Sequence, residues 1–173
     1  MTDFLRRLIF CAALLWPLGS LAQSGAVSEV SMKAVLLFRL PQFVYWPQNE
    51  KPPAVLLCVQ GNPAFSRLLQ QLVHSSRANT EIRSVELNSG YVACDLLFVS
   101  RSESAQLETI LQQADARRLL TVSDIPGFVR AGGMVELVML GDKVGVSLNR
   151  RAAQKRGFDF NAQLLSLAQR VEQ

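Results

Sequence analysis

The residues of this chain that could do chemistry gather in the stretch from Leu119 to Asn149. An apolar run, Leu119–Val122, is typical of a strand buried on both faces, and a loop rich in glycine and proline follows Ser123-Asp124. Gly132-Gly133 can adopt backbone angles closed to other residues, so the loop can fold tightly over the end of the strand. Because open α/β sheets bind ligands beyond the carboxyl ends of their strands, this loop is a candidate binding site.

Asp124 stands at a strand end, where some α/β proteins carry a phospho-accepting aspartate. That chemistry needs an acidic pair after the first strand, but Gln60-Gly61-Asn62 stands there instead. We therefore expect the Asp124 carboxylate to accept hydrogen bonds from the backbone amides of its loop.

The chain offers no recognisable set of catalytic residues. It has no G-x-S-x-G, H-E-x-x-H, phosphate-loop or G-x-G-x-x-G pattern. Its one histidine, His74, has no partner at the spacing of a metal site or a catalytic triad. We therefore expect a protein that is not an enzyme and that needs no metal ion and no cofactor.

Basic side chains are candidates for anion binding. The cluster Arg150, Arg151, Lys155 and Arg156 could bind a nucleotide or an acidic partner surface, or could be the solvated face of a helix. Arg130 in the glycine-rich loop is a further candidate for the same role.

Aromatic side chains are a second kind of candidate. The segment Phe43–Pro47 reads FVYWP and follows a helical pattern that Pro41 should kink or end. Its rings could seal the edge of the core, or Tyr45 and Trp46 could form a contact surface, since such rings contribute much of the binding energy at interfaces. The full candidate surface for a partner or ligand comprises Tyr45, Trp46, Asp124, Phe128, Arg130, Asn149, Arg150 and Arg151.

The first 22 residues have the organisation of a secretory signal peptide. Arg6 and Arg7 precede a short apolar run, and Ser20-Leu21-Ala22 suits cleavage after Ala22. An uncleaved membrane anchor is the alternative, although the run is short for a span. Two of the 18 basic and one of the 14 acidic residues lie in this leader, which leaves 16 basic and 13 acidic residues. This mild charge and the export favour a secreted protein with no nucleic-acid partner and no later membrane span.

Export leaves two cysteines, Cys58 and Cys94. In an oxidising compartment such a pair suggests one disulfide, and neighbouring strands of one sheet could bring the two within bonding distance. The bond would close a loop of about 36 residues and contribute about 3–4 kcal/mol in the chain-entropy model. Two free buried thiols that pack as small apolar groups are the alternative.

Periodicity and turn residues predict the remaining elements. Strands are expected at Ala54–Val59, Glu81–Leu87, Asp95–Val99, Leu119–Val122, Met134–Leu140 and Lys143–Leu148, with Gly141-Asp142 as a two-residue hairpin turn. Helices are expected over Val27–Val44, after Asn62-Pro63, after Ser100 with Glu103 as a capping box, over Arg150–Arg156, and after Asn161 with Leu164, Leu167, Ala168 and Val171 facing inward. Their order predicts one domain over residues 23–173, a three-layer α/β/α sandwich whose sheet is largely parallel with an antiparallel C-terminal hairpin.

Several motifs in this order resemble the YfiR-like family of exported bacterial proteins. They are F-V-Y-W-P, L-L-C-V-Q-G, C-D-L-L-F-V-S, the segment L-L-T-V-S-D-I-P-G-F-V-R-A-G-G-M-V, then V-G-V-S-L-N-R-R-A-A and Q-L-L-S-L-A. The resemblance covers nearly all of the chain after the leader, and the segment Thr121–Val135 with Asn149 and Ala152-Ala153 is its specific part.

The resemblance implies a periplasmic regulator. Relatives of this kind repress an inner-membrane diguanylate cyclase by binding its periplasmic sensor region, and they can dimerise. Cys58 and Cys94 fall at the matching strand positions, so the resemblance implies that they form a disulfide. A second, more C-terminal cysteine pair of some relatives is absent, because no cysteine follows Cys94. The alternative function is a periplasmic subunit that binds a nucleotide or an aromatic ligand through the loop Ser123–Gly133 and the basic helix.

Overall fold

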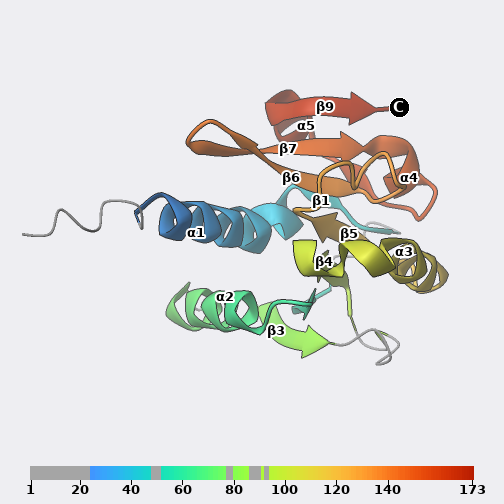
Figure 1. The fold of residues 1–173 in the computed structure, drawn as a ribbon. Coiled ribbons are helices and arrows are strands. Elements are labelled where there is room, and N and C mark those ends of the chain that lie inside the picture. The colour runs from blue at the N-terminus through green and yellow to red at the C-terminus, as the bar shows by residue number, and fades with distance from the viewer. Residues whose placement is uncertain (1–23, 48–51, 77–79, 86–90, 92–93) are drawn as a thin grey trace, which may run out of the picture.

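The computed structural model describes residues 24–47, 52–76, 80–85, 91 and 94–173 (Figure 1). The predicted signal peptide lies outside this part of the chain. The helices are α1 (Ser24–Arg39), α2 (Pro63–Ser76), α3 (Leu107–Ala116), α4 (Arg150–Gln154) and α5 (Ala162–Leu167), with 3-10 turns at Leu40–Gln42 and Arg101–Gln106. The strands are β1 (Val44–Tyr45), β2 (Val55–Gln60), β3 (Thr80–Val85), β4 (Leu96–Val99), β5 (Leu120–Ser123), β6 (Val135–Leu140), β7 (Lys143–Asn149), β8 (Asp159–Phe160) and β9 (Ala168–Glu172).

One mixed sheet forms the middle of the molecule, with strand order β3-β2-β4-β5-β6-β7-β9. Strands β3 to β6 run parallel, β7 returns antiparallel to β6, and β9 lies parallel to β7. The predicted fold class is therefore confirmed, and the predicted edge strand is β3. Gly141 has a φ of +63° in the turn between β6 and β7, as a two-residue hairpin with glycine first requires.

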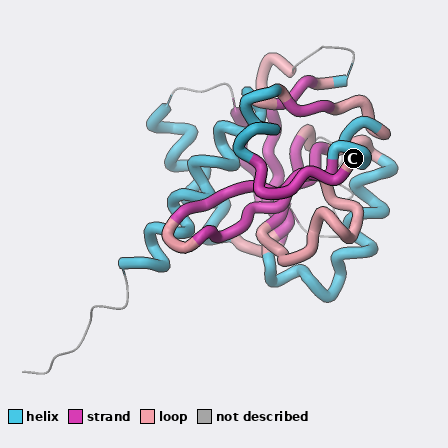
Figure 2. The backbone as a smooth tube through the Cα atoms, turned by 90° about the horizontal axis from the view of Figure 1, so that it is seen from above, coloured by secondary structure: helices cyan, strands magenta, loops and turns pink. Residues whose placement is uncertain are grey.

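Helices cover both faces of this sheet, and Figure 2 shows the strands in the middle with helices to either side. The apolar runs of β2, β4 and β5 are buried along their whole length because alternate residues face opposite layers. In β2, for example, Leu57 packs in the layer of α1 and α2, whereas Leu56 packs in the layer of α3. The three-layer architecture follows from these two cores.

The first helix ends as the sequence predicts. α1 stops at Arg39, and Pro41 lies in the 3-10 turn that follows, where its missing N–H interrupts no helical bond. The side chains of Asn62, Asn149 and Asn161 each accept a hydrogen bond from the backbone N–H three residues later, so these predicted helix caps are confirmed.

The predicted final helix is wrong beyond Leu167. α5 ends there, Ala168 takes an extended conformation with ψ of 134°, and the chain continues as β9. Leu164 is buried as expected, but Leu167 is 64% exposed. As a strand, residues Ala168–Glu172 pair with the edge of β7, where a continued helix would have left that edge open.

The predicted capping box after Ser100 is also wrong. No side-chain bond caps this position, and a 3-10 segment precedes α3. The Glu103 carboxylate instead accepts a hydrogen bond of 3.1 Å from Gln60 Nε2 at the end of β2. Glu103 therefore contacts the end of the neighbouring strand β2 and does not form the predicted capping bond with Ser100.

Candidate functional site

Asp124 lies at the carboxyl end of β5, but its partners come from other segments of the chain. Its Oδ2 accepts a hydrogen bond of 3.0 Å from Lys33 Nζ on α1, and its Oδ1 accepts one of 3.0 Å from the backbone N–H of Arg101. The expectation that Asp124 binds the amides of its own loop is wrong, because the Ser123 hydroxyl accepts the nearest one, from Ile125. Lys33, buried in the core, also pairs with Glu29 at 2.6 Å.

This arrangement closes the carboxyl end of β5 with a side chain of the protein itself. The Lys33 ammonium occupies the position at which an open α/β sheet would receive a ligand, and two carboxylates neutralise it. The ion pair therefore fastens α1 to the end of the sheet, and Asp124 has a structural part in the site.

Side chains of β6 and β7 hold the glycine-rich loop after Asp124 in place through hydrogen bonds. Glu136 on β6 accepts hydrogen bonds from the backbone N–H groups of Gly127 and Val129, at 3.0 and 3.3 Å. Asn149, besides capping α4, donates to the Val129 carbonyl at 2.9 Å. Phe128 is fully buried, and its ring lies so close to Gly133 that a Cβ there would clash with it. Phe128 is therefore a core residue of the loop and no part of an exposed surface.

Tyr45 and Trp46 have different environments, although they are adjacent in the chain. Trp46 is buried, donates from Nε1 to the Pro41 carbonyl at 3.2 Å, and packs edge-on against Phe158. Of the two interpretations of the aromatic segment, sealing of the core edge is correct for this ring. Tyr45 is 57% exposed on β1 and is available for a contact surface.

Arg150 lies near Tyr45 because β1 pairs with β8, where Tyr45 is opposite Asp159. The Arg150 guanidinium donates two hydrogen bonds of 2.8 Å to the two oxygens of the Asp159 carboxylate. These bonds lower the pKa of Asp159 to about 2 and raise the pKa of Arg150 above its usual value.

The helix predicted over Arg150–Arg156 ends at Gln154, so the basic cluster is divided between α4 and the turn after it. Most of this cluster is engaged within the protein. Arg151 donates to the carbonyl of Gln173 at 2.7 Å, and Arg156 forms an ion pair with Asp115. With Arg150 held by Asp159, three of the four predicted anion-binding side chains already have acceptors. The solvated-face interpretation therefore describes this helix better than an anion site does.

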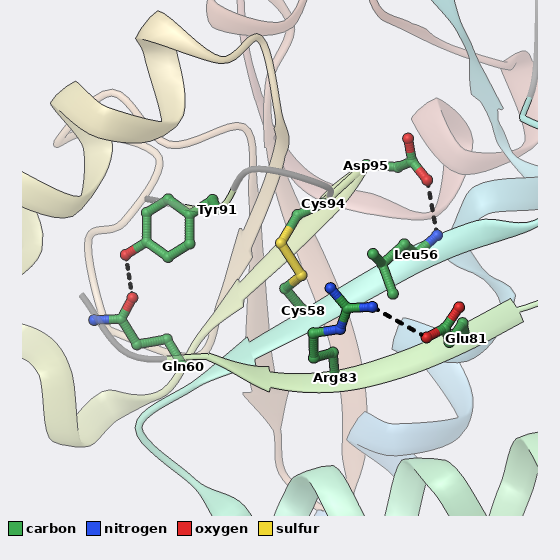
Figure 3. Close-up of a disulfide and its surroundings, with 8 residues drawn as sticks. All are labelled: Leu56, Cys58, Gln60, Glu81, Arg83, Tyr91, Cys94 and Asp95. Atoms are coloured by element: carbon green, nitrogen blue, oxygen red, sulfur yellow. Dashed lines mark hydrogen bonds and ion pairs between the residues drawn. A yellow bond between two sulfur atoms is a disulfide. The ribbon is translucent and has the colours of Figure 1, made fainter. Parts of the chain in front are cut away.

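A disulfide joins Cys58 and Cys94, whose Cα atoms are 5.8 Å apart (Figure 3). It ties β2 to Cys94, two residues before β4, and the adjacent Asp95 also accepts a hydrogen bond of 2.7 Å from the Leu56 N–H. Tyr91, three residues before Cys94, is buried on the same side and donates its hydroxyl to Gln60 Oε1. Burial raises the pKa of Tyr91 to about 12.

A groove that sequence reasoning missed lies between α1, the start of β7 and α5. Its volume is about 550 Å³, and its lining is almost entirely apolar, from Met32, Val35, Leu36, Phe43, Val144, Leu164 and Leu167. Two exposed cations, Arg39 and Lys143, also line it, and neither forms an ion pair with another described residue. We name this feature the apolar groove. The outward-facing Val35 was the available signal, since it adds an apolar residue to the solvent side of α1.

The described residues also set limits on the kind of site. They contain no group of three His, Cys, Asp or Glu side chains placed to hold a metal ion. Within the same ranges, no helix is both long and apolar enough to cross a membrane.

The structure is an α/β domain with a mostly parallel sheet, and the apolar groove lies beside the β7 end of that sheet. The chain belongs to the YfiR/HmsC-like family (DUF4154), whose sequence pattern matches residues 30–169. Membership in this family fits a periplasmic regulatory protein.

The fold is similar to one in the crystal structure of a conserved domain protein from Vibrio cholerae O1 biovar El Tor str. N16961. The TM-score is 0.62 at 11% sequence identity, and the match covers 83% of this chain and 60% of that chain. At this identity the similarity concerns the fold alone. None of the curated proteins compared with the chain matches it.

Proposed function

We propose that this chain is an exported repressor that binds the periplasmic sensor region of an inner-membrane diguanylate cyclase and thereby lowers cyclic di-GMP. The family and the apolar groove support this proposal. A partner can repress a cyclase only if it binds the inactive state more tightly than the active one. A difference of about 2–3 kcal/mol would change activity by one to two decades.

The apolar groove is the observation that carries the proposal. Val35 and Leu167 line it and are 42% and 64% exposed, so apolar area remains in water in the isolated chain. The cations at Arg39 and Lys143 favour an occupant with acidic residues beside its apolar ones. We infer that an amphipathic, acidic segment of the cyclase's periplasmic region lies in the groove, as helices do in apolar grooves elsewhere.

The chain offers a matched pair of positions for the test. Val35 lines the groove, whereas Val30 does not; both are on α1 and are exposed to 42% and 43%. Val35→Asp places a carboxylate inside the groove and should weaken partner binding by about 2 kcal/mol, or about 30-fold. Val30→Asp makes the same chemical change outside it and should leave binding near the wild-type value.

Cyclic di-GMP is measured in a strain that lacks the gene and in the same strain carrying each version of it. Deletion should raise cyclic di-GMP, and wild type and Val30→Asp should restore the low level, whereas Val35→Asp should not, at equal periplasmic amounts. An unchanged level after deletion would contradict repression. Restoration by Val35→Asp would show that the cyclase binds elsewhere.

A further inference from the structure

A second pocket lies on the opposite face of the β6–β7 hairpin from the apolar groove. Its volume is about 380 Å³, and it is bounded by the glycine-rich loop above and by strands β6, β7 and β9 below. Glu136, Ser147 and Arg170 form a row across its floor, because Glu136 is opposite Ser147 and Ser147 is opposite Arg170. Arg130 enters from the loop, where its guanidinium lies over Gly127.

A bulge in β9 gives this pocket its polar wall. The register shifts between Val146 and Ser147, which are opposite Ala168 and Arg170, so that Gln169 is the extra residue. Such a bulge turns two successive side chains toward one face of a sheet. Gln169 and Arg170 accordingly both line the pocket.

The donors of this pocket form no hydrogen bond or ion pair with another described residue. Ser147 is 8% exposed, and its hydroxyl forms no hydrogen bond to any other described residue. Arg130 and Arg170 form no ion pair in the ranges for which side chains are described. The Ser147 hydroxyl is not fully enclosed, so a ligand or water in the pocket can satisfy it.

Glu136, the acidic residue that lines the pocket, already accepts two hydrogen bonds. Both oxygens of Glu136 accept backbone N–H groups, from Gly127 and Val129, so this carboxylate holds the loop in place and is not available to pair with both arginines. The pocket therefore presents two guanidinium groups, a hydroxyl and an amide around a single fixed negative charge.

We propose that this pocket, formed by Arg130, Ser147, Gln169 and Arg170, binds a carboxylate group. Guanidinium groups bind carboxylates through paired, charge-assisted hydrogen bonds, and the hydroxyl and amide supply further donors. The nearby Glu136 charge selects against a phosphate dianion, since it repels two charges more strongly than one. Val138 and Leu140 on the same wall favour a ligand with a short apolar part beside the carboxylate.

Two sources have this chemistry: a free small carboxylic acid, or a glutamate or aspartate side chain of a bound protein. The two probes are therefore succinate and a blocked tri-glutamate peptide, with inorganic phosphate at matched ionic strength as the reference anion. Binding is followed by titration calorimetry and by the amide NMR signals of β6, β7 and β9 in the full mature chain.

Whichever of the two probes binds, Arg130→Gln and Arg170→Gln should each weaken its binding about tenfold, because each removes a charged hydrogen bond. Both side chains are exposed, so neither variant should lower the melting temperature appreciably. Lys155→Gln is the matched control: it removes the same charge at the residue after α4, outside the pocket, and should change binding by less than about twofold at physiological salt. Ser147→Ala removes only the hydroxyl and should also weaken binding.

If succinate binds saturably, and if Arg130→Gln and Arg170→Gln weaken this binding, the ligand is a free acid. Binding of the peptide alone would support an acidic side chain of a partner. The proposal is overturned if neither probe saturates, if Lys155→Gln weakens binding as much as Arg170→Gln, or if phosphate binds as tightly as the carboxylates. None of these results depends on whether a cyclase occupies the apolar groove.

Discussion

Lys33 offers the sharpest test of how this domain is held together. Its ammonium is buried between the carboxylates of Asp124 and Glu29, and it joins the first helix to the end of β5. Lys33→Met keeps most of the aliphatic side chain and removes the charge. Asp124 is then left with its hydrogen bond from the Arg101 N–H and with the exposed Arg101 guanidinium at 3.9 Å, but without the buried cation.

The expected cost follows from the geometry. Loss of one partner from a buried ion pair costs about 3–5 kcal/mol, and the remaining bond to Arg101 and the partial exposure of Asp124 reduce this to about 2–3 kcal/mol. For a domain of this size, that corresponds to a melting temperature lower by about 4–12 °C. Asp124→Asn should cost less, because Lys33 keeps Glu29 as its partner.

Urea unfolding followed by tryptophan fluorescence provides the measurement. In protein lacking the first 22 residues, the buried Trp46 is the one tryptophan and reports directly on the core. If the pair is coupled, the variant carrying both changes should lose less free energy of unfolding than the sum of the single losses. Additive losses, or a Lys33→Met variant as stable as wild type, would refute the ion pair as the fastening of α1.

Two further predictions concern the disulfide and its neighbour. Replacing Cys58 and Cys94 together with serine should lower the free energy of unfolding by about 3–4 kcal/mol. Urea unfolding can compare this variant with oxidised and with reduced wild-type protein. Equal stability of the three samples would count against the estimate. Tyr91, whose pKa is about 12 in the folded protein and near 10 when unfolded, contributes stability that is complete below pH 10 and is lost as the pH rises through 12. Tyr91→Phe should therefore flatten the fall of stability between pH 10 and 12, and an unchanged pH profile would contradict the raised pKa.

The central strands could be predicted because local composition alone determines them. The runs around Leu57, Leu97 and Val122 are apolar at successive positions, which suits a strand covered on both sides, and the asparagine caps act within three residues. Such patterns need no knowledge of the rest of the chain.

The C-terminal strand could not be predicted in the same way. Leu164, Leu167, Ala168 and Val171 have helical spacing, and the sequence contains no breaker after Asn161. The deciding factor is the free edge of β7, which offers Ala168–Glu172 hydrogen-bond partners that only the assembled sheet provides.

The loop after β5 could be located from the sequence, but its contacts and the apolar groove could not be. Asp124, Asn149 and Arg130 do lie around the loop after β5, as the strand-end rule indicates. The partner of Asp124 is Lys33, 91 residues away, and no local pattern joins the two. The apolar groove likewise combines residues of α1, β7 and α5, whose juxtaposition depends on where β9 places the C-terminal segment.

The position of β9 also affects the order in which the strands of the sheet can pair during synthesis. β9 is synthesised after β7, yet it covers the outer side of β7, whose other neighbour, β6, is already in place through a two-residue turn. Until β9 has been synthesised, β7 is an exposed sheet edge at which another nascent chain could pair. Deletion of β9 should therefore make the protein prone to aggregate.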